Sequence, residues 1–156
     1  MRFALVIHSY FPYGGQQRDF MRIAKECLSR GHEVTVYAFR WEGVVPEQIE
    51  LVTVPIKGFT RLARYRNFSQ WVTEQINARP VDAIIGFTKM PGLDIYYAAD
   101  PCFIEKAITQ RGFYYRYTPR YFHFKDFEEQ IFGAGIKTKI LTLSELQRQV
   151  YLKHYP

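Results

Sequence analysis

The first 31 residues form a pattern that few folds can accommodate. Residues 2–8 (RFALVIH) are a short apolar run, and residues 9–15 (SYFPYGG) form a turn-rich loop that ends in two glycines. Residues 16–30 then repeat apolar side chains at helical spacing. Gly31 ends this predicted helix, and residues 33–38 (EVTVYA) are predicted as the next strand. In a strand–loop–helix–strand unit of this kind, the glycine loop leads into the positive end of the helix, where free backbone N–H groups can bind a phosphate.

The remainder of the chain continues the alternation of strands and helices. Apolar runs that favour strands lie at residues 49–54, 83–87, 95–98 and 139–143. Apolar spacing predicts helices that include residues 68–76, 105–117 and 119–132, interrupted near Gly112 and Pro119. Ser144 begins a last helix as its N-cap, with Gln147 three residues later in a capping-box arrangement. This alternation predicts one α/β domain, a doubly wound parallel sheet with helices on both faces.

Composition limits the class of protein further. The chain has 156 residues, which is enough for one domain with a substantial core. No stretch approaches the roughly 20 apolar residues that span a bilayer, and the apolar run at residues 3–7 is too short for a signal peptide. Of the two cysteines, Cys27 falls on the apolar face of the first helix, and Cys102 has no partner in a CxxC motif. We therefore expect a cytoplasmic protein without a disulfide or a metal site.

The net charge of +6 is concentrated in the second part of the chain. Residues 1–56 carry six basic and six acidic side chains, whereas residues 57–156 carry fifteen basic and nine acidic ones. Residues 57–66 have four basic side chains and no acid. Residues 106–125, called here the basic aromatic window, have five basic side chains, seven aromatic ones and no acid. An anionic partner is expected to bind at these two segments.

Residues that directly follow predicted strands are the candidates for a site, because ligands of such sheets bind outside the carboxyl ends of the strands. The selected segments are residues 8–15, 40–43, 88–92 and 99–102. Gly14 and Gly15 allow two interpretations: they permit a tight turn, or they let a phosphate approach the helix. The loop matches neither G-x-G-x-x-G nor G-x-x-x-x-G-K-[ST], so a standard nicotinamide site or a P-loop is not expected.

Several strings of residues resemble a known family. The stretch RGHEV at residues 30–34, together with the preceding glycine loop, is similar to the amino-terminal half of retaining family 4 glycosyltransferases. Those enzymes have two Rossmann-like domains that face each other across a cleft, the GT-B architecture. More specific strings resemble the bacterial lipopolysaccharide core glucosyltransferases, and they are YFPYGGQQRDFMRIA at 10–24, WEG at 41–43, GFTKMPGLD at 86–94 and AAD at 98–100. The resemblance extends over the whole chain.

The resemblance implies a reaction and a site. UDP-glucose would donate glucose, with retention, to the inner-core heptose of lipopolysaccharide, and the donor diphosphate would lie near Gly14 and Gly15. Negative charge on the leaving phosphate would be stabilised by backbone N–H groups, so no metal cofactor is expected, and the chain has no Asp-x-Asp motif. The resemblance places Asp100 against the transferred sugar as the catalytic candidate, although a helix cap before Pro101 is the alternative.

Two weaker candidates for substrate binding are Lys89 and Asp19. Lys89 follows a strand and could contact a phosphate of the acceptor, or it could be a solvated lysine of a loop. Asp19 falls in the first turn of the predicted first helix, where an acid also favours the helix dipole.

The resemblance also gives the basic aromatic window a meaning, because the acceptor would be an amphiphile in the inner leaflet. Aromatic rings settle at membrane interfaces, and Arg and Lys bind anionic headgroups. The predicted membrane-binding residues are Arg111, Arg116, Arg120, Lys125, Phe113, Tyr114, Tyr115 and Tyr117, assisted by Arg61, Arg64 and Arg66. The alternative is that half of the aromatic residues are core and the basic ones form a solvated face. A peripheral location on the cytoplasmic face of the inner membrane is therefore expected.

Two other classes of function remain as alternatives. A nucleic-acid-binding module would suit basic residues mixed with aromatics, but the doubly wound pattern and the lack of an RNA-binding motif disfavour it. A non-catalytic membrane- or polyanion-binding domain that acts with a partner is the second alternative. By the resemblance, residues 1–156 are the acceptor-side domain of the enzyme, and the carboxy-terminal nucleotide-sugar domain is not in this chain. We expect the chain alone to turn over little.

Overall fold

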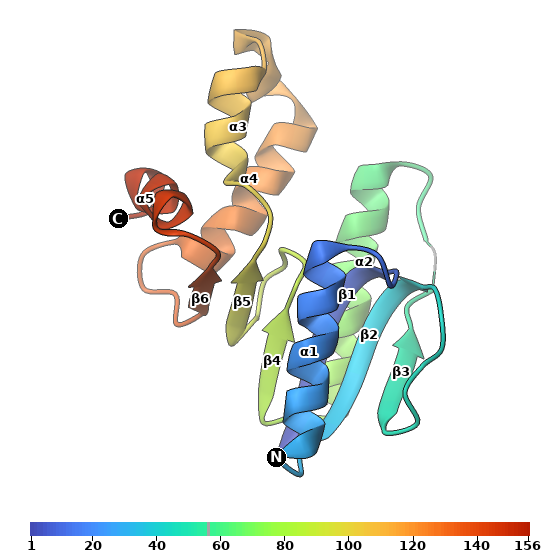
Figure 1. Ribbon diagram of the computed structural model, residues 1–156. Helices are drawn as coiled ribbons and strands as arrows, with labels where there is room; N and C mark the ends of the chain where they lie inside the picture. The colour runs from blue at the N-terminus through green and yellow to red at the C-terminus, as the bar shows by residue number, and fades with distance from the viewer. Residues whose placement is uncertain (56) are drawn as a thin grey trace.

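The computed structural model describes residues 1–55 and 57–156, and it contains a central sheet with helices on both faces (Figure 1). The strands are β1 (Arg2–Tyr10), β2 (Glu33–Trp41), β3 (Ile49–Thr53), β4 (Ala83–Gly86), β5 (Ile95–Ala98) and β6 (Lys139–Thr142). The α-helices are α1 (Gly15–Ser29), α2 (Arg61–Ala78), α3 (Phe103–Gln110), α4 (Pro119–Phe132) and α5 (Glu145–His154), and a 3₁₀ helix, η1, covers Phe113–Tyr117.

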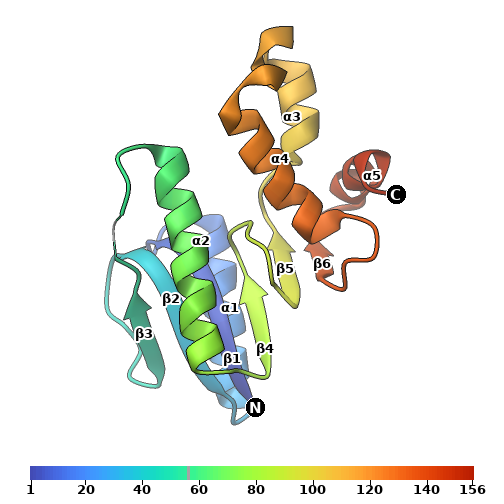
Figure 2. The same ribbon diagram turned by 180° about the vertical axis from the view of Figure 1, so that it is seen from behind.

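The sheet is parallel and its strand order is β3-β2-β1-β4-β5-β6. The order reverses beside β1, as in a doubly wound Rossmann-like fold. Helix α1 covers one face of the sheet (Figure 1), and α2 and α4 cover the other (Figure 2). The predicted fold class is therefore confirmed.

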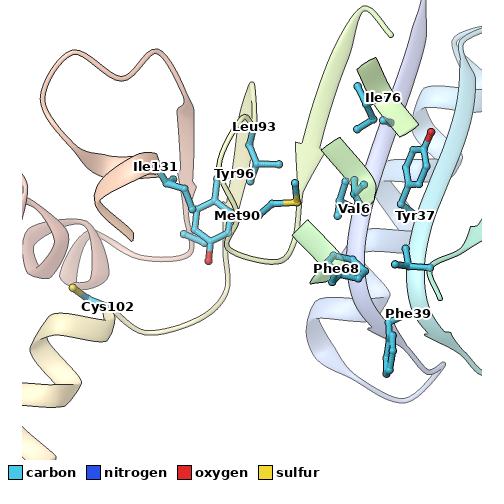
Figure 3. Packing of buried hydrophobic residues seen from close by; sticks show 14 of the residues in the cluster. Val6, Tyr37, Phe39, Phe68, Ile76, Met90, Leu93, Tyr96, Cys102 and Ile131 are labelled. Atoms are coloured by element: carbon cyan, nitrogen blue, oxygen red, sulfur yellow. The ribbon is translucent and has the colours of Figure 1, made fainter. Parts of the chain in front are cut away.

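Strand β1 is apolar because it is buried on both faces of the sheet. Leu5 and Ile7 pack in the cluster that contains Phe20 of α1, whereas Ala4 and Val6 belong to the cluster under α2. Figure 3 shows this second cluster, in which Phe68 of α2 lies close to Val6. The alternation of strand side chains thus forms two cores, one on each face.

The end of α1 follows from a glycine. Gly31 has a φ of +79°, which a side chain would strain. The backbone N–H groups of Gly31 and His32 donate to the carbonyls of Leu28 and Cys27, the pattern of a Schellman motif. The predicted helix end at Gly31 is therefore confirmed.

Several predicted boundaries were displaced. β1 and β2 extend to Tyr10 and Trp41, beyond the predicted ends at residues 8 and 38, because these two rings are register partners and stack at 4.0 Å between centroids. The helix predicted at residues 105–117 is divided into α3 and η1 at Gly112, the residue where an interruption was expected. Ser144 caps α5 as predicted, with its hydroxyl accepting from the backbone N–H of Gln147.

The two-sided burial of β1 predicts a large cost for truncating its side chains. Leu5 has no exposed surface, so Leu5→Ala should lower the free energy of unfolding by about 3 kcal/mol through lost burial and the cavity left behind. Leu146→Ala is the matched control, because 74% of Leu146 is exposed. Chemical denaturation measures both, and equal losses would contradict the assigned core.

Candidate functional site

A cavity of about 740 Å³ lies at the carboxyl edge of the sheet. Its floor includes the ends of β1 and β2, and its walls come from the first residues of α2 and from α3, η1 and α4. Figure 1 shows α2 on one side and the α3–α4 pair on the other, both reaching beyond the ends of the strands. The cavity is therefore where the doubly wound topology predicts a ligand.

His8 is the aromatic centre of the cavity floor. Its ring stacks between Phe39 and Tyr65, with centroid distances of 5.0 and 4.7 Å. Burial lowers the pKa of His8, and the nearby charges of Arg61 and Arg40 lower it further. His8 was selected only as part of the segment after the first strand, because its two stacking partners are distant in the sequence.

The glycine loop leads into α1 without a side-chain cap. Gly14 is the N-cap and has extended backbone, and neither glycine has a positive φ, so no turn geometry requires them. A Cβ atom at Gly14 would collide with the side chain of Gln17, whereas one at Gly15 would meet open space. Gly14 is therefore required by close packing, whereas the open space at Gly15 leaves room for a ligand. The two glycines lie beside the cavity, and the following Gln16 and Gln17 line it.

Asp100 lines the cavity between β5 and α3, and its side chain is exposed. Its backbone carbonyl accepts hydrogen bonds from the Tyr151 hydroxyl at 2.9 Å and from Nε2 of Gln147 at 3.3 Å. These two bonds from α5 fix the backbone at Asp100. The helix-cap alternative is wrong, because Cys102 is the N-cap of α3 and makes no side-chain cap bond.

Lys89 also lines the cavity, but it is not a solvated lysine of a loop. Its ammonium group lies 2.7 Å from Oε2 of Glu128 and donates to the carbonyl of Pro101 at 3.0 Å. Only 15% of the Lys89 side chain is exposed. Lys89 therefore ties the segment after β4 to the segment that carries Asp100.

Glu128 of α4 was not predicted as a functional residue, and it lies behind the cavity lining, where it is paired with Lys89. It is completely buried and accepts from the backbone N–H groups of Phe103 and Ile104 at 2.6 and 3.2 Å, so it caps α3 from another helix. The Tyr155 hydroxyl and the Cys102 thiol donate to Oε1 at 3.0 and 3.3 Å. Burial alone would raise its pKa, but the adjacent ammonium group and the backbone donors hold the pKa below its ordinary value.

Asp19 lies outside the cavity lining. It is beyond the first turn of α1, so the expected interaction with the helix dipole does not apply. Its carboxylate accepts from the Tyr97 hydroxyl at 2.6 Å. Burial and this hydrogen bond raise the pKa of Tyr97 to about 12. The contact joins α1 to β5 near the carboxyl edge of the sheet.

The basic aromatic window has two faces. Arg111, Tyr115 and Arg120 line the cavity, together with Lys106 and Phe124. By contrast, 64% of Phe113, 84% of Tyr114 and 67% of Tyr117 is exposed outside the cavity lining. Arg116 is exposed too, and Lys125 pairs with Glu129 on the same helix. Of the seven aromatic residues, only Tyr121 belongs to the buried core, so fewer than the half expected under the core alternative are core residues.

The remaining sequence expectations concern cysteines, metals and membranes. Cys27 and Cys102 are free, and burial raises the pKa of the Cys102 thiol to about 11, which makes it a poor nucleophile. Within residues 1–55 and 57–156, no group of three or more His, Cys, Asp or Glu side chains is placed to hold a metal ion. No helix in this described part has the length and apolarity to cross a bilayer.

Comparisons with known proteins agree on one family. Residues 13–133 match Glycosyltransferase Family 4. The chain is 45% identical over 152 residues to the lipopolysaccharide glucosyltransferase WaaG of Escherichia coli strain K12, covering 97% of this chain and 41% of that protein. A crystal structure of WaaG, described as a glycosyltransferase involved in lipopolysaccharide biosynthesis, superposes with a TM-score of 0.94 at 45% identity. That match covers 98% of this chain and 41% of the solved chain. This chain therefore spans about two fifths of the length of these relatives.

The buried pair of Lys89 and Glu128 predicts a pH-dependent stability. Glu128→Gln keeps the shape but leaves the ammonium group without its counter-charge, so the free energy of unfolding should fall by about 3 kcal/mol at neutral pH. Because the folded pKa of Glu128 lies below its ordinary 4.5, its contribution is complete above that value and is lost as the pH falls through the folded pKa.

Denaturation curves recorded from neutral to acidic pH measure this effect. The difference between the wild-type protein and Glu128→Gln should shrink on acidification. A difference that stays constant with pH would show that the carboxylate charge does not stabilise the fold.

Proposed function

Because the chain belongs to glycosyltransferase family 4, we propose that it is the acceptor-side half of a retaining glucosyltransferase of lipopolysaccharide synthesis. The enzyme would transfer glucose from UDP-glucose to a heptose of the core. The observation that carries this proposal is the sequence identity to a lipopolysaccharide glucosyltransferase along nearly the whole chain. The relatives are more than twice as long as this chain, which supports a further domain that binds the nucleotide.

The amino terminus of α1 is the proposed place of the donor diphosphate. No side chain caps it, and no Cβ atom occupies the space at Gly15. The free N–H groups and the helix dipole favour a negative group there. They would stabilise charge on the leaving phosphate more strongly as the glycosidic bond breaks. The proposal therefore needs no metal cofactor.

Asp100 is the proposed catalytic residue. Its exposed carboxylate lines the cavity, while two hydrogen bonds from α5 hold its backbone. In that position it would bind a hydroxyl of the sugar, orient the acceptor or stabilise positive character at the anomeric carbon. We do not assign it as a covalent nucleophile, and we propose transfer on the front face of the donor sugar.

The exposed aromatic residues of the basic aromatic window support a peripheral position on the cytoplasmic face of the inner membrane. Phe113, Tyr114 and Tyr117 expose apolar rings next to the cation of Arg116. Rings of this kind enter the headgroup region, and each nearby Arg or Lys adds about 1 kcal/mol of attraction to anionic lipid. The lipid-linked acceptor would then be bound at the surface where it resides.

The assignment of Asp100 predicts that its removal stops transfer and leaves the fold intact. In the full-length protein, Asp100→Ala should lower the rate of glucose transfer to a heptose-terminated core acceptor by about a hundredfold or more. Its melting temperature should not change, because the Asp100 side chain caps no helix.

Retention is tested separately on the wild-type enzyme, by determining the anomeric configuration of the product by NMR.

Asp126→Ala is the matched control, because Asp126 is exposed on α4 and does not line the cavity. Wild-type turnover in Asp100→Ala would remove Asp100 from the catalytic site. Absence of transfer by the full-length wild-type protein would instead favour the alternative of a non-catalytic membrane- or polyanion-binding domain.

The exposed rings predict a specific loss of membrane binding. A variant with Phe113, Tyr114 and Tyr117 changed to Ser should bind vesicles of phosphatidylcholine and phosphatidylglycerol about tenfold more weakly in a sedimentation assay. Leu146→Ser, which alters an exposed apolar residue of α5, should not weaken binding. Equal wild-type binding to neutral and anionic vesicles would exclude an electrostatic contribution.

A further inference from the structure

We propose that the cavity contains a subsite for the carboxylate or phosphate groups of an anionic saccharide, which under the proposed function is the acceptor. Six cationic side chains form this subsite, called here the cationic ring: Arg40, Arg61, Arg64, Lys106, Arg111 and Arg120. The ring comes from both segments in which the sequence concentrates its basic residues, with Arg40 added from the end of β2.

The cationic ring carries charge that the protein does not neutralise. Of the residues that the structure describes, Asp100 is the only carboxylate that lines the cavity, against the six cations of the ring and Lys89. Lys89 is already neutralised by the buried Glu128. Among the described residues, no member of the ring forms an ion pair with an acidic side chain, although such pairs occur elsewhere on the surface. The cavity therefore has an excess of positive charge for a ligand to balance.

Aromatic rings position four of the six charges without cancelling them. Four guanidinium groups lie over neighbouring rings at 5.3–5.8 Å from the centroid, and the pairs are Arg40 with Phe39, Arg61 with Tyr65, Arg111 with Tyr115, and Arg120 with Phe124. A cation–π contact limits the motion of a side chain but leaves its N–H donors and its charge available. A guanidinium held in this way can donate two parallel hydrogen bonds to a carboxylate or a phosphate.

The position of the cationic ring distinguishes its ligand from the other two anions of the proposed reaction. The donor diphosphate is assigned to Gly14 and Gly15, which do not line the cavity. Lipid headgroups meet the outward face of the window, where Arg116 and the exposed rings lie. The lowered pKa of His8, caused by burial and by two members of the ring, is consistent with positive potential at the floor. The anionic saccharide is therefore assigned to the cavity, apart from the positions assigned to the diphosphate and to the lipid headgroups.

Binding measurements on the full-length protein test the subsite with two probes. Inositol hexakisphosphate tests for an anion site of any origin, and the deacylated, heptose-terminated core oligosaccharide tests for the acceptor. Arg61→Gln and Arg111→Gln, one from each wall, should each weaken the binding of both probes by about tenfold in titration calorimetry. Arg61→Lys keeps the charge but loses the planar guanidinium group. Its affinity for both probes should therefore lie between that of the wild-type protein and that of Arg61→Gln.

Arg30→Gln is the matched control, because it removes the same charge at the opposite edge of the sheet and should leave both affinities unchanged. Unchanged binding of both probes in the two cavity variants would overturn the subsite, even in an enzyme that transfers glucose. Weakened binding of the hexakisphosphate without any oligosaccharide binding would support the anion site and overturn the proposed acceptor.

Vesicle binding separates the saccharide from the lipid headgroup. Arg116→Gln should weaken binding to phosphatidylcholine–phosphatidylglycerol vesicles more than Arg61→Gln or Arg111→Gln does. If the two cavity variants lost vesicle binding and kept oligosaccharide affinity, the ring would serve the membrane and the subsite would be wrong. In the transfer assay the cavity variants should raise KM for the acceptor more than they lower kcat.

Discussion

The buried carboxylate of Glu128 joins the parts of the molecule that form the cavity. An isolated carboxylate in an apolar interior costs many kcal/mol, so a buried one persists only where donors surround it. Here Lys89, two backbone N–H groups of α3 and the Tyr155 hydroxyl supply those donors. The segment after β4, the start of α3, helix α4 and the end of the chain are therefore held in one arrangement. The wall formed by α3 and α4, and the backbone next to Asp100, depend on it.

The cavity itself is a consequence of this arrangement and of the sheet. A parallel sheet brings the ends of β1 and β2 to one edge, which places His8 beside Phe39. Helix α2 begins beyond that edge, so Tyr65 in its second turn reaches the other side of the imidazole. The opposite wall lies beyond the end of β5, where the donors around Glu128 fix α3 and α4. The sheet thus determines the position of the cavity floor. The hydrogen bonds and the ion pair around Glu128 determine the position of α3 and α4, which form the opposite wall.

The sequence was sufficient for the fold because the signals were local. Apolar runs, helical spacing and Gly31 act within one element, and they predicted the strands, α1 and its end. The contacts that build the site were not local. Glu128 and Glu129 are adjacent and chemically identical, but Glu128 is fully buried and Glu129 is exposed, because only one of them points towards Lys89. Asp100 could be placed at the correct edge from the strand before it. The break at Gly112 was also predicted, but which side chains of the basic aromatic window line the cavity depends on the packing of α3, η1 and α4, which is not local in the sequence.

This division suggests how one segment could serve a lipid-linked acceptor. Under the proposed function the acceptor is an amphiphile, with its saccharide in the cavity and its lipid in the bilayer. Tyr115 and Arg111 face the cavity, whereas Tyr114 and Tyr117, a few residues along the same segment, are exposed away from it. Two weak contacts on one rigid segment act on the same molecule, so the second forms at a high effective concentration once the first is made. Neither contact then needs to be strong, which lets the product leave after transfer.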